Sequence, residues 1–209
     1  SALPRSETSR SPVLCFTAFI KIPKPFASQS CGPGRIIDPL KRNGTGEAGI
    51  TIKVIQWATG AMGRTALRRI IDDPLLALAG VHVYSQAKAG HDAGEIARRP
   101  MTGVLATADL AQTLAIDADV VIHTPRITLP YDALVPDVEA LLRSGKNVIS
   151  TAGFHWPAAQ GPDYADRLHR AAIEGGATLA GVGVSPGMIV ERIALAATAM
   201  SVEVDHIHV

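Results

Sequence analysis

One stretch of the chain, residues 51–71, constrains the fold more than any other. It reads TIKVIQWATGAMGRTALRRII: a short run rich in β-branched and apolar residues, a glycine turn from Gly60 to Gly63, and apolar residues at helical spacing. Strand, tight turn and helix in this order form the first unit of a dinucleotide-binding α/β fold, in which backbone N–H groups at the helix start bind a pyrophosphate. The alternative interpretation is a tight turn in some other α/β fold.

The glycine turn departs at one position from the usual fingerprint, G-x-G-x-x-G. This chain reads ATGAMG from Ala58 to Gly63, so alanine replaces the first glycine. Gly60 leaves no Cβ between the turn and a phosphate, and Gly63 lets the helix pack close to the strand. The predicted cofactor-binding residues of this turn are Thr59, Gly60, Ala61, Met62, Gly63 and Arg64.

The composition excludes several classes of function. The chain has 209 residues, 47% of them hydrophobic, and a formal net charge of +1. This balance gives no electrostatic attraction to nucleic acid or to an anionic membrane, and no apolar run approaches the ~20 residues of a membrane span. Both cysteines, Cys15 and Cys31, lie in the N-terminal tail, and no Cys and His cluster predicts a metal site. A cytoplasmic protein fits this cysteine usage.

The composition also changes along the chain. Residues 1–49 are rich in Ser, Pro, Arg and Lys, which predicts a disordered or non-native N-terminal extension, with a targeting segment as the alternative. Residues 50–200 are expected to form the nucleotide-binding domain. Residues 201–209 are expected to begin a second, substrate-binding domain that is largely missing.

Strand and helix patterns alternate from residue 51 onward. Strands are predicted at 51–58, 76–84, 103–106, 119–123, 147–150, 177–181 and 202–209, and helices at 62–72, 93–98, 110–114, 133–143, 164–174 and 189–200. This alternation predicts an α/β protein with a Rossmann-type, doubly wound and mostly parallel sheet. The last predicted strand would be an unpaired edge, so we expect the chain to self-associate.

The end of the second predicted strand indicates which nucleotide would bind. Sites that prefer NAD usually place Asp or Glu there, about 20 residues after the glycines, to bond the ribose hydroxyls. Here the strand ends in Val83-Tyr84-Ser85, without an acid. Ser85 can donate to a 2′-phosphate, and Lys88 or Arg64 can supply positive charge, so NADP is predicted as the preferred cofactor and NAD as the alternative. Lys88 could instead be a solvated surface residue.

Ligands of such a sheet lie beyond the carboxyl ends of its strands. The candidate strand ends are at 123–126, 150–157 and 181–187. Small or hydroxyl-bearing residues there, such as Gly153 and Ser185, suit a flat nicotinamide ring. His155 is the candidate catalytic residue, because an imidazole can act as a general acid or base. The alternative is that His155 only packs a loop between Phe154 and Trp156.

Five motifs in fixed order extend this interpretation: WATGAMGRTALRRIIDDP, VYSQAKAGHDAGEIARRP, DADVVIHTPR, GKNVIST and GVGVSPGMI. From about residue 50 to 209 the chain resembles the dihydrodipicolinate-reductase-like proteins, most closely the branch of 2,4-diaminopentanoate dehydrogenases and native amine dehydrogenases. The resemblance implies an NAD(P)-dependent oxidoreductase that interconverts an amine or amino-acid-type substrate with its imine or ketone. The alternative is a non-catalytic NAD(P)-binding module or an inactive fragment of such an enzyme.

The resemblance also assigns individual residues. It implies that Thr124, Pro125 and Arg126 line the nicotinamide side and that Ser185 closes over the ring. Amine-dehydrogenase members carry a catalytic glutamate just after the strand matching 147–150, where this chain reads Gly-Phe-His. This difference moves the role to His155 or another residue. A small-molecule amine, ketone or imine substrate and a homodimer or higher homo-oligomer are further implications.

Overall fold

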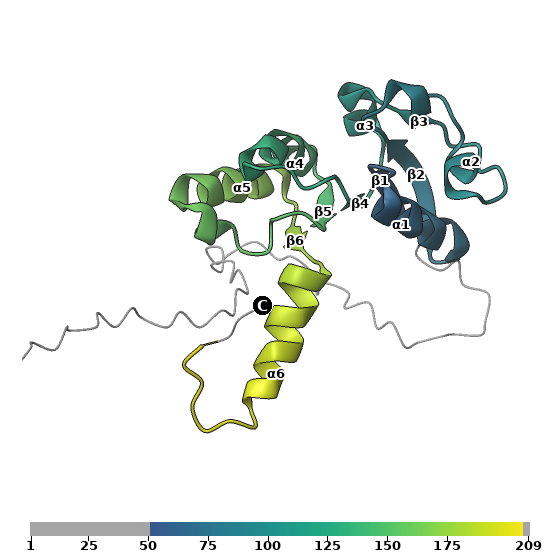
Figure 1. Ribbon diagram of the computed structural model, residues 1–209. Helices are drawn as coiled ribbons and strands as arrows, with labels where there is room; N and C mark the ends of the chain where they lie inside the picture. Colours follow the sequence, from purple (N-terminus) through teal and green to yellow (C-terminus); the bar gives the residue numbers. More distant parts are fainter. Residues whose placement is uncertain (1–50, 207–209) are drawn as a thin grey trace, which may run out of the picture.

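The computed structural model describes residues 51–206, and Figure 1 shows their arrangement. The expectations for residues 1–49, with Cys15 and Cys31, lie outside the described residues, as does the end of the chain from 207 to 209. Within 51–206, a six-stranded sheet has the order β3-β2-β1-β4-β5-β6, and each neighbouring pair is parallel. The predicted doubly wound α/β fold is therefore confirmed.

Five of the six strands lie within their predicted ranges, whereas β3 shares only residue 106 with the predicted strand at 103–106. They are β1 Ile52–Trp57, β2 Leu76–His82, β3 Ala106–Thr107, β4 Val120–His123, β5 Asn147–Ser150 and β6 Leu179–Gly181. The α-helices are α1 Ala61–Asp72, α2 Ala93–Ala97, α3 Leu110–Ala115, α4 Val135–Arg143, α5 Pro162–Gly175 and α6 Leu195–Thr198. Short 3-10 turns are η1 Gln86–Lys88, η2 Tyr131–Leu134 and η3 Pro157–Gln160, and η4 Val184–Ala194 is a π-helix.

Two apolar clusters cover the two faces of this sheet. One cluster joins β1, β4 and β5 to α4 and α5, and includes Trp57, Val138 and Leu168. The other joins β2 to α1 and α2, and includes Leu67 and Val81. Helices on both faces bury the apolar strands, as a parallel sheet requires.

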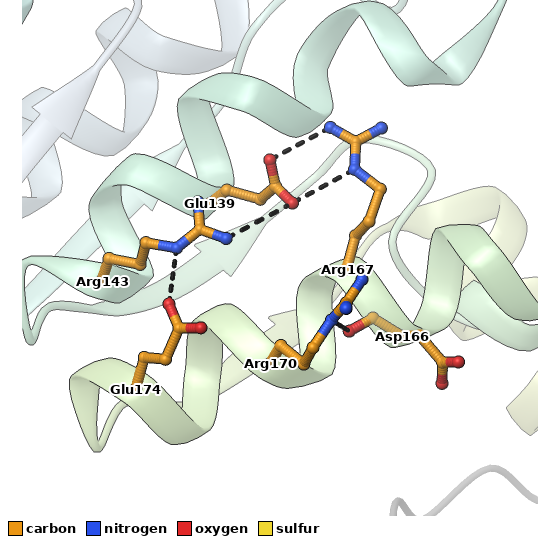
Figure 2. Close-up of polar contacts among 6 residues, drawn as sticks. All are labelled: Glu139, Arg143, Asp166, Arg167, Arg170 and Glu174. Carbon is orange, nitrogen blue, oxygen red and sulfur yellow. Dashed lines mark hydrogen bonds and ion pairs between the residues drawn. The ribbon is translucent and has the colours of Figure 1, made fainter.

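Charged side chains also join helices α4 and α5 (Figure 2). Glu139 of α4 is largely buried and accepts hydrogen bonds from Arg167 Nε at 3.2 Å and Nη2 at 3.0 Å. Arg143 Nε donates to Glu174 of α5 at 2.7 Å. A two-point contact of this kind fixes geometry as well as charge, so it sets the register of α4 against α5.

Helix α1 packs unusually close to the end of β1. A Cβ on Gly63 would stand 2.1 Å from the carbonyl oxygen of Ala58, so no larger residue fits there. This confirms the predicted reason for a glycine at that position. Ala58 itself has φ 68°, in the left-handed region that favours glycine. The first glycine of the fingerprint is thus replaced at a position whose backbone conformation still suits glycine.

The C-terminal part differs most from the prediction. The helix expected at 189–200 begins earlier, at Val184, and in Figure 1 it extends away from the sheet. The strand expected at 202–209 is wrong for residues 202–206, which form no strand. Val202 is fully exposed there and lies outside the six-stranded sheet. The alternation of valines alone did not define a strand, so residues 202–206 provide no strand edge for self-association.

None of the helices within residues 51–206 combines the length and the apolar character needed to cross a membrane.

The strain at Ala58 gives a stability prediction. A non-glycine residue in the left-handed region costs about 1–2 kcal/mol, whereas glycine costs about 0.5–1 kcal/mol of chain entropy. We expect Ala58→Gly to leave the free energy of unfolding unchanged or to raise it by up to about 1 kcal/mol. Ala66→Gly within α1 is the control and should lower it by about 1 kcal/mol. Urea unfolding measures the free energy of unfolding of both variants. An equal loss of stability in the two variants would contradict the strain at Ala58.

Candidate functional site

A cavity of about 630 Å³ lies at the carboxyl ends of the strands. Its described lining residues follow five different strands: 58–62 after β1, 83–85 and 88 after β2, 124–127 after β4, 151–153 and 155 after β5, and 183–184 after β6. The cavity lies at the point where the strand order reverses, between β1 and β4. Open α/β sheets bind their ligands at this point.

The glycine turn forms the cavity wall at the start of α1. Gly60 is the N-cap residue, and no atom lies within 4 Å of the place where its Cβ would stand. Its φ is −67°, so glycine is not required by the backbone conformation. The first turn of α1 carries no acidic residue, and the first N–H groups of a helix have no partner within it. An open glycine face beside free N–H groups fits a phosphate group.

Lys88 brings a positive charge to the same wall. Its Nζ donates to the carbonyl oxygen of Thr59 at 3.0 Å and to Thr59 Oγ1 at 3.2 Å. Ser85, at the start of η1, lines the cavity beside it. Lys88 and Arg126 are basic, and no Asp or Glu is among the described lining residues. The wall therefore favours an anionic ligand.

A buried polar network holds the turn from below. Gln56 is fully buried, and its Nε2 donates to Thr124 Oγ1 at 2.8 Å and to the carbonyl oxygen of Ala58 at 2.8 Å. Thr124 Oγ1 in turn donates to the carbonyl oxygen of Trp57 at 3.0 Å. The network ties β4 to the strained end of β1. The sequence reasoning missed Gln56, although an amide among apolar residues in a central strand was a usable signal.

The last residues of four neighbouring strands form the layer beneath the cavity. Trp57 is in register with His82 on one side and with His123 on the other, and His123 is in register with Ser150. The rings of Trp57 and His82 stack with centroids 3.8 Å apart. His123 Nδ1 lies 2.8 Å from Ser150 Oγ, and His82 Nδ1 lies 2.8 Å from Thr113 Oγ1.

Both histidines of this row are held neutral. Burial lowers the pKa of His82 to about 4 and that of His123 to about 3. Neither histidine is among the described lining residues of the cavity. The expectation that His123 ends a strand is confirmed, and both residues pack the layer under the site.

Tyr84 is a cavity residue that the sequence reasoning did not select. Its hydroxyl accepts from Trp57 Nε1 at 2.8 Å and donates to Asp137 Oδ2 at 3.4 Å. Partial burial raises the pKa of the Tyr84 hydroxyl to about 12 and also raises the pKa of Asp137. The ring is therefore fixed at the end of β2, with 54% of the residue exposed.

His155 lines the cavity after β5, next to the start of η4. Both ring nitrogens are shielded from solvent and have no hydrogen-bond partner in the described part of the chain. The backbone of His155 packs directly on β6, since a Cβ on Gly181 would stand 2.5 Å from His155 N.

The structure gathers most of the predicted site residues around one cavity. Those that line it are Thr59, Gly60, Ala61, Met62, Ser85, Lys88, Thr124, Pro125, Arg126, Gly153 and His155. Gly63 instead packs against Ala58, and Arg64 belongs to the first turns of α1 outside the described lining. Ser185 falls in η4, next to Val184, which lines the cavity.

No group of three or more His, Cys, Asp or Glu side chains within residues 51–206 is arranged to hold a metal ion.

The comparisons with known proteins agree with this geometry. The family model described as dihydrodipicolinate reductase, N-terminus, matches residues 52–161. An amine dehydrogenase of Streptomyces virginiae is 35% identical over 141 residues, which cover 65% of this chain and 39% of that protein. A 4-hydroxy-tetrahydrodipicolinate reductase of Rhizobium meliloti is 29% identical over 163 residues, covering 74% of this chain and 62% of that protein.

Among solved structures, an amine dehydrogenase from Mycobacterium smegmatis superposes with a TM-score of 0.65 at 20% identity. The match covers 74% of this chain and 45% of that one, and it shows a shared fold. The chain thus spans less than two thirds of the length of each of these relatives.

The buried histidines predict a loss of stability in mild acid. Their pKa values in the folded chain lie below the ordinary 6.5, so the unfolded chain takes up protons first as the pH falls. The contribution of the neutral, buried histidines to the free energy of unfolding is complete above about pH 6.5 and is lost as the pH falls toward 4. We expect the free energy of unfolding to fall by about 1–2 kcal/mol per histidine between pH 7 and pH 5.

Urea unfolding at the two pH values measures this loss. His123→Asn should remove roughly half of it, because one of the two groups no longer titrates. His169→Gln, at an exposed site on α5, is the control and should keep the full pH dependence. If His123→Asn also kept the full pH dependence of stability, the buried imidazole of His123 would not be the source of that dependence.

Proposed function

Because the chain belongs to the dihydrodipicolinate reductase family through its N-terminal domain, we propose that it is part of an NAD(P)H-dependent oxidoreductase. The reaction would interconvert an amine or amino-acid-type substrate with its imine or ketone. One relative is named an amine dehydrogenase and the other a reductase, which supports oxidation and reduction as the chemistry.

One observation carries the proposal more than any other. The open side of Gly60 faces a cavity of about 630 Å³ at the start of α1, where a phosphate is stabilised by helix N–H groups. When bound, a nicotinamide dinucleotide would supply the hydride acceptor or donor. Its pyrophosphate would lie against Thr59, Gly60, Ala61 and Met62, with Gly63 allowing the close helix. Its nicotinamide would lie toward Thr124, Pro125, Arg126, Gly153 and Ser185.

NADP is proposed over NAD at the adenosine end. Ser85 and Lys88 follow β2, and no acidic side chain is among the described residues lining that end of the cavity. An ammonium group near the ribose would attract a 2′-phosphate, whereas a carboxylate would select the free hydroxyl. Arg64 lies further along α1 and could contribute only through longer-range attraction.

A non-catalytic nucleotide-binding module is the second candidate. The absence of a carboxylate among the described lining residues favours it, because the amine dehydrogenases that this chain resembles would use a glutamate. Oxidation of NADPH by the chain in the presence of a ketone and ammonia would exclude this candidate. A small-molecule substrate, a homodimer or higher homo-oligomer and a cytoplasmic location stay predictions.

Filling the space beside Gly60 tests nucleotide binding. The φ of −67° and the empty surroundings allow a larger residue, so Gly60→Val should change the free energy of unfolding by less than about 1 kcal/mol. Its side chain would occupy the phosphate space and weaken NADPH binding about tenfold or more. Fluorescence titration with NADPH measures the affinity.

The matched control for this variant is Thr65→Val, which adds the same side chain to an exposed site on α1 outside the cavity lining. It should bind NADPH as the unmodified chain does. Unchanged binding by a folded Gly60→Val chain would overturn the placement of the pyrophosphate.

Neutralising Lys88 tests the choice of nucleotide. A hydrogen bond to a charged group contributes about 1.5–3 kcal/mol, so Lys88→Gln should weaken NADPH binding about tenfold or more. NADH binding should change much less, because NADH carries no 2′-phosphate. Lys53→Gln, at the opposite end of β1, removes an exposed lysine and serves as the control. Equal weakening for both dinucleotides would place Lys88 at the pyrophosphate instead.

A further inference from the structure

His155 is the most unusual polar side chain of the cavity. Both ring nitrogens are shielded from solvent, and neither has a hydrogen-bond partner in the described part of the chain. A neutral imidazole carries one N–H donor and one bare acceptor nitrogen. Leaving both without partners costs free energy, and an unsatisfied buried group in a folded protein calls for an explanation such as a bound ligand or a catalytic role.

The described residues around the ring do not supply a hydrogen-bond partner. A Cβ on Gly187 would stand 3.5 Å from His155 Nε2, so η4 passes the ring here with a residue that has no side chain. The neighbouring wall of the cavity consists of small or apolar residues, including Gly153, Gly183 and Val184. These side chains offer no acceptor or donor to the imidazole.

The other ionisable groups of the cavity are already engaged or lie elsewhere. Lys88 is bonded to Thr59, and the Tyr84 hydroxyl is bonded to Trp57 and Asp137. Arg126 is an exposed guanidinium, which stays charged and does not exchange protons readily. Of the described lining residues, His155 alone carries a ring N–H and a second ring nitrogen that both lack a hydrogen-bond partner among the described residues.

From this geometry we infer that His155 is the catalytic residue that binds the reacting nitrogen of the substrate and exchanges its proton, an inference that rests on the proposed function. In the oxidative direction, an N–H bond of the substrate ammonium breaks and the proton bonds to a ring nitrogen. With a nicotinamide dinucleotide bound, the lone pair left on the substrate nitrogen would form the C=N bond, and the hydride of the adjacent carbon would reduce the dinucleotide. Addition of water to the iminium carbon would then give the ketone and an ammonium ion.

Two substitutions separate this role from simple packing. His155→Phe keeps an aromatic ring between Phe154 and Trp156 but removes both nitrogens, and His155→Gln keeps polar atoms but cannot exchange a proton in the same way. Both should lower kcat by about 100-fold or more, with NADPH affinity unchanged. Full activity of His155→Phe would show that the ring only packs the loop. Thermal unfolding of each variant confirms that it is folded.

Imidazole NMR gives a readout that does not depend on turnover. Two-bond 1H–15N spectra of the full chain are recorded alone, with NADP+, and then with NADP+ and 2-aminopentane as the probe amine. The His155 signals are assigned by their loss in His155→Gln, and His169→Gln provides the control. We expect the His155 ring nitrogens to shift when the amine is added, while those of His82 and His123 stay in place.

The outcomes distinguish a failure of the His155 role from a failure of nucleotide binding. If NADP+ binds and the His155 nitrogens do not respond to the amine at any concentration, the role of His155 is overturned and the nucleotide site stands. If NADP+ itself does not bind, the proposed function fails and the role of His155 fails with it. A shift of the His155 signals with both ligands present supports the proposal.

Discussion

The close approach of α1 to the end of β1 is the contact on which the rest of the site depends. Gly63 has no side chain, so the helix start lies against the carbonyl oxygen of Ala58. Gln56 and Thr124 bond to the same end of β1 from below. These contacts hold the turn in a left-handed conformation at Ala58 and turn the free N–H groups of α1 toward the cavity.

The layer beneath the cavity gives that turn a rigid base. Trp57 stacks on His82 and lies beside His123, with its indole N–H bonded to Tyr84. The imidazoles of His82 and His123 stay neutral because they are buried, and each ring packs in this layer while one nitrogen makes a hydrogen bond. The same layer that supports the site therefore makes the fold sensitive to acid, because protonating either ring would place an unpaired charge in the interior.

Much of the fold follows from local sequence patterns. The run from Asn147 to Ser150 formed a strand with the predicted bounds, and the helix predicted at 110–114 formed as α3, with Asp109 accepting from the N–H groups of Ala111 and Gln112. Prediction failed where a pattern needed a distant partner. Residues 202–206 alternate like a strand but lie outside the six-stranded sheet, and η4 begins five residues before the predicted helix. Gln56 was missed because its partner, Thr124, follows β4 and lies 68 residues away in the chain.

The sequence by itself determined the strand, turn and helix around Gly60, since each depends on backbone preferences within a few residues. It also determined that the strand ends would carry the site, because parallel strands place their carboxyl ends at one edge. The tertiary structure alone decided the layer formed by Trp57, His82 and His123, which depends on register between strands far apart in the chain. It also decided that the His155 ring has no bonding partner among the described residues, since that depends on how β6 and η4 pack around it.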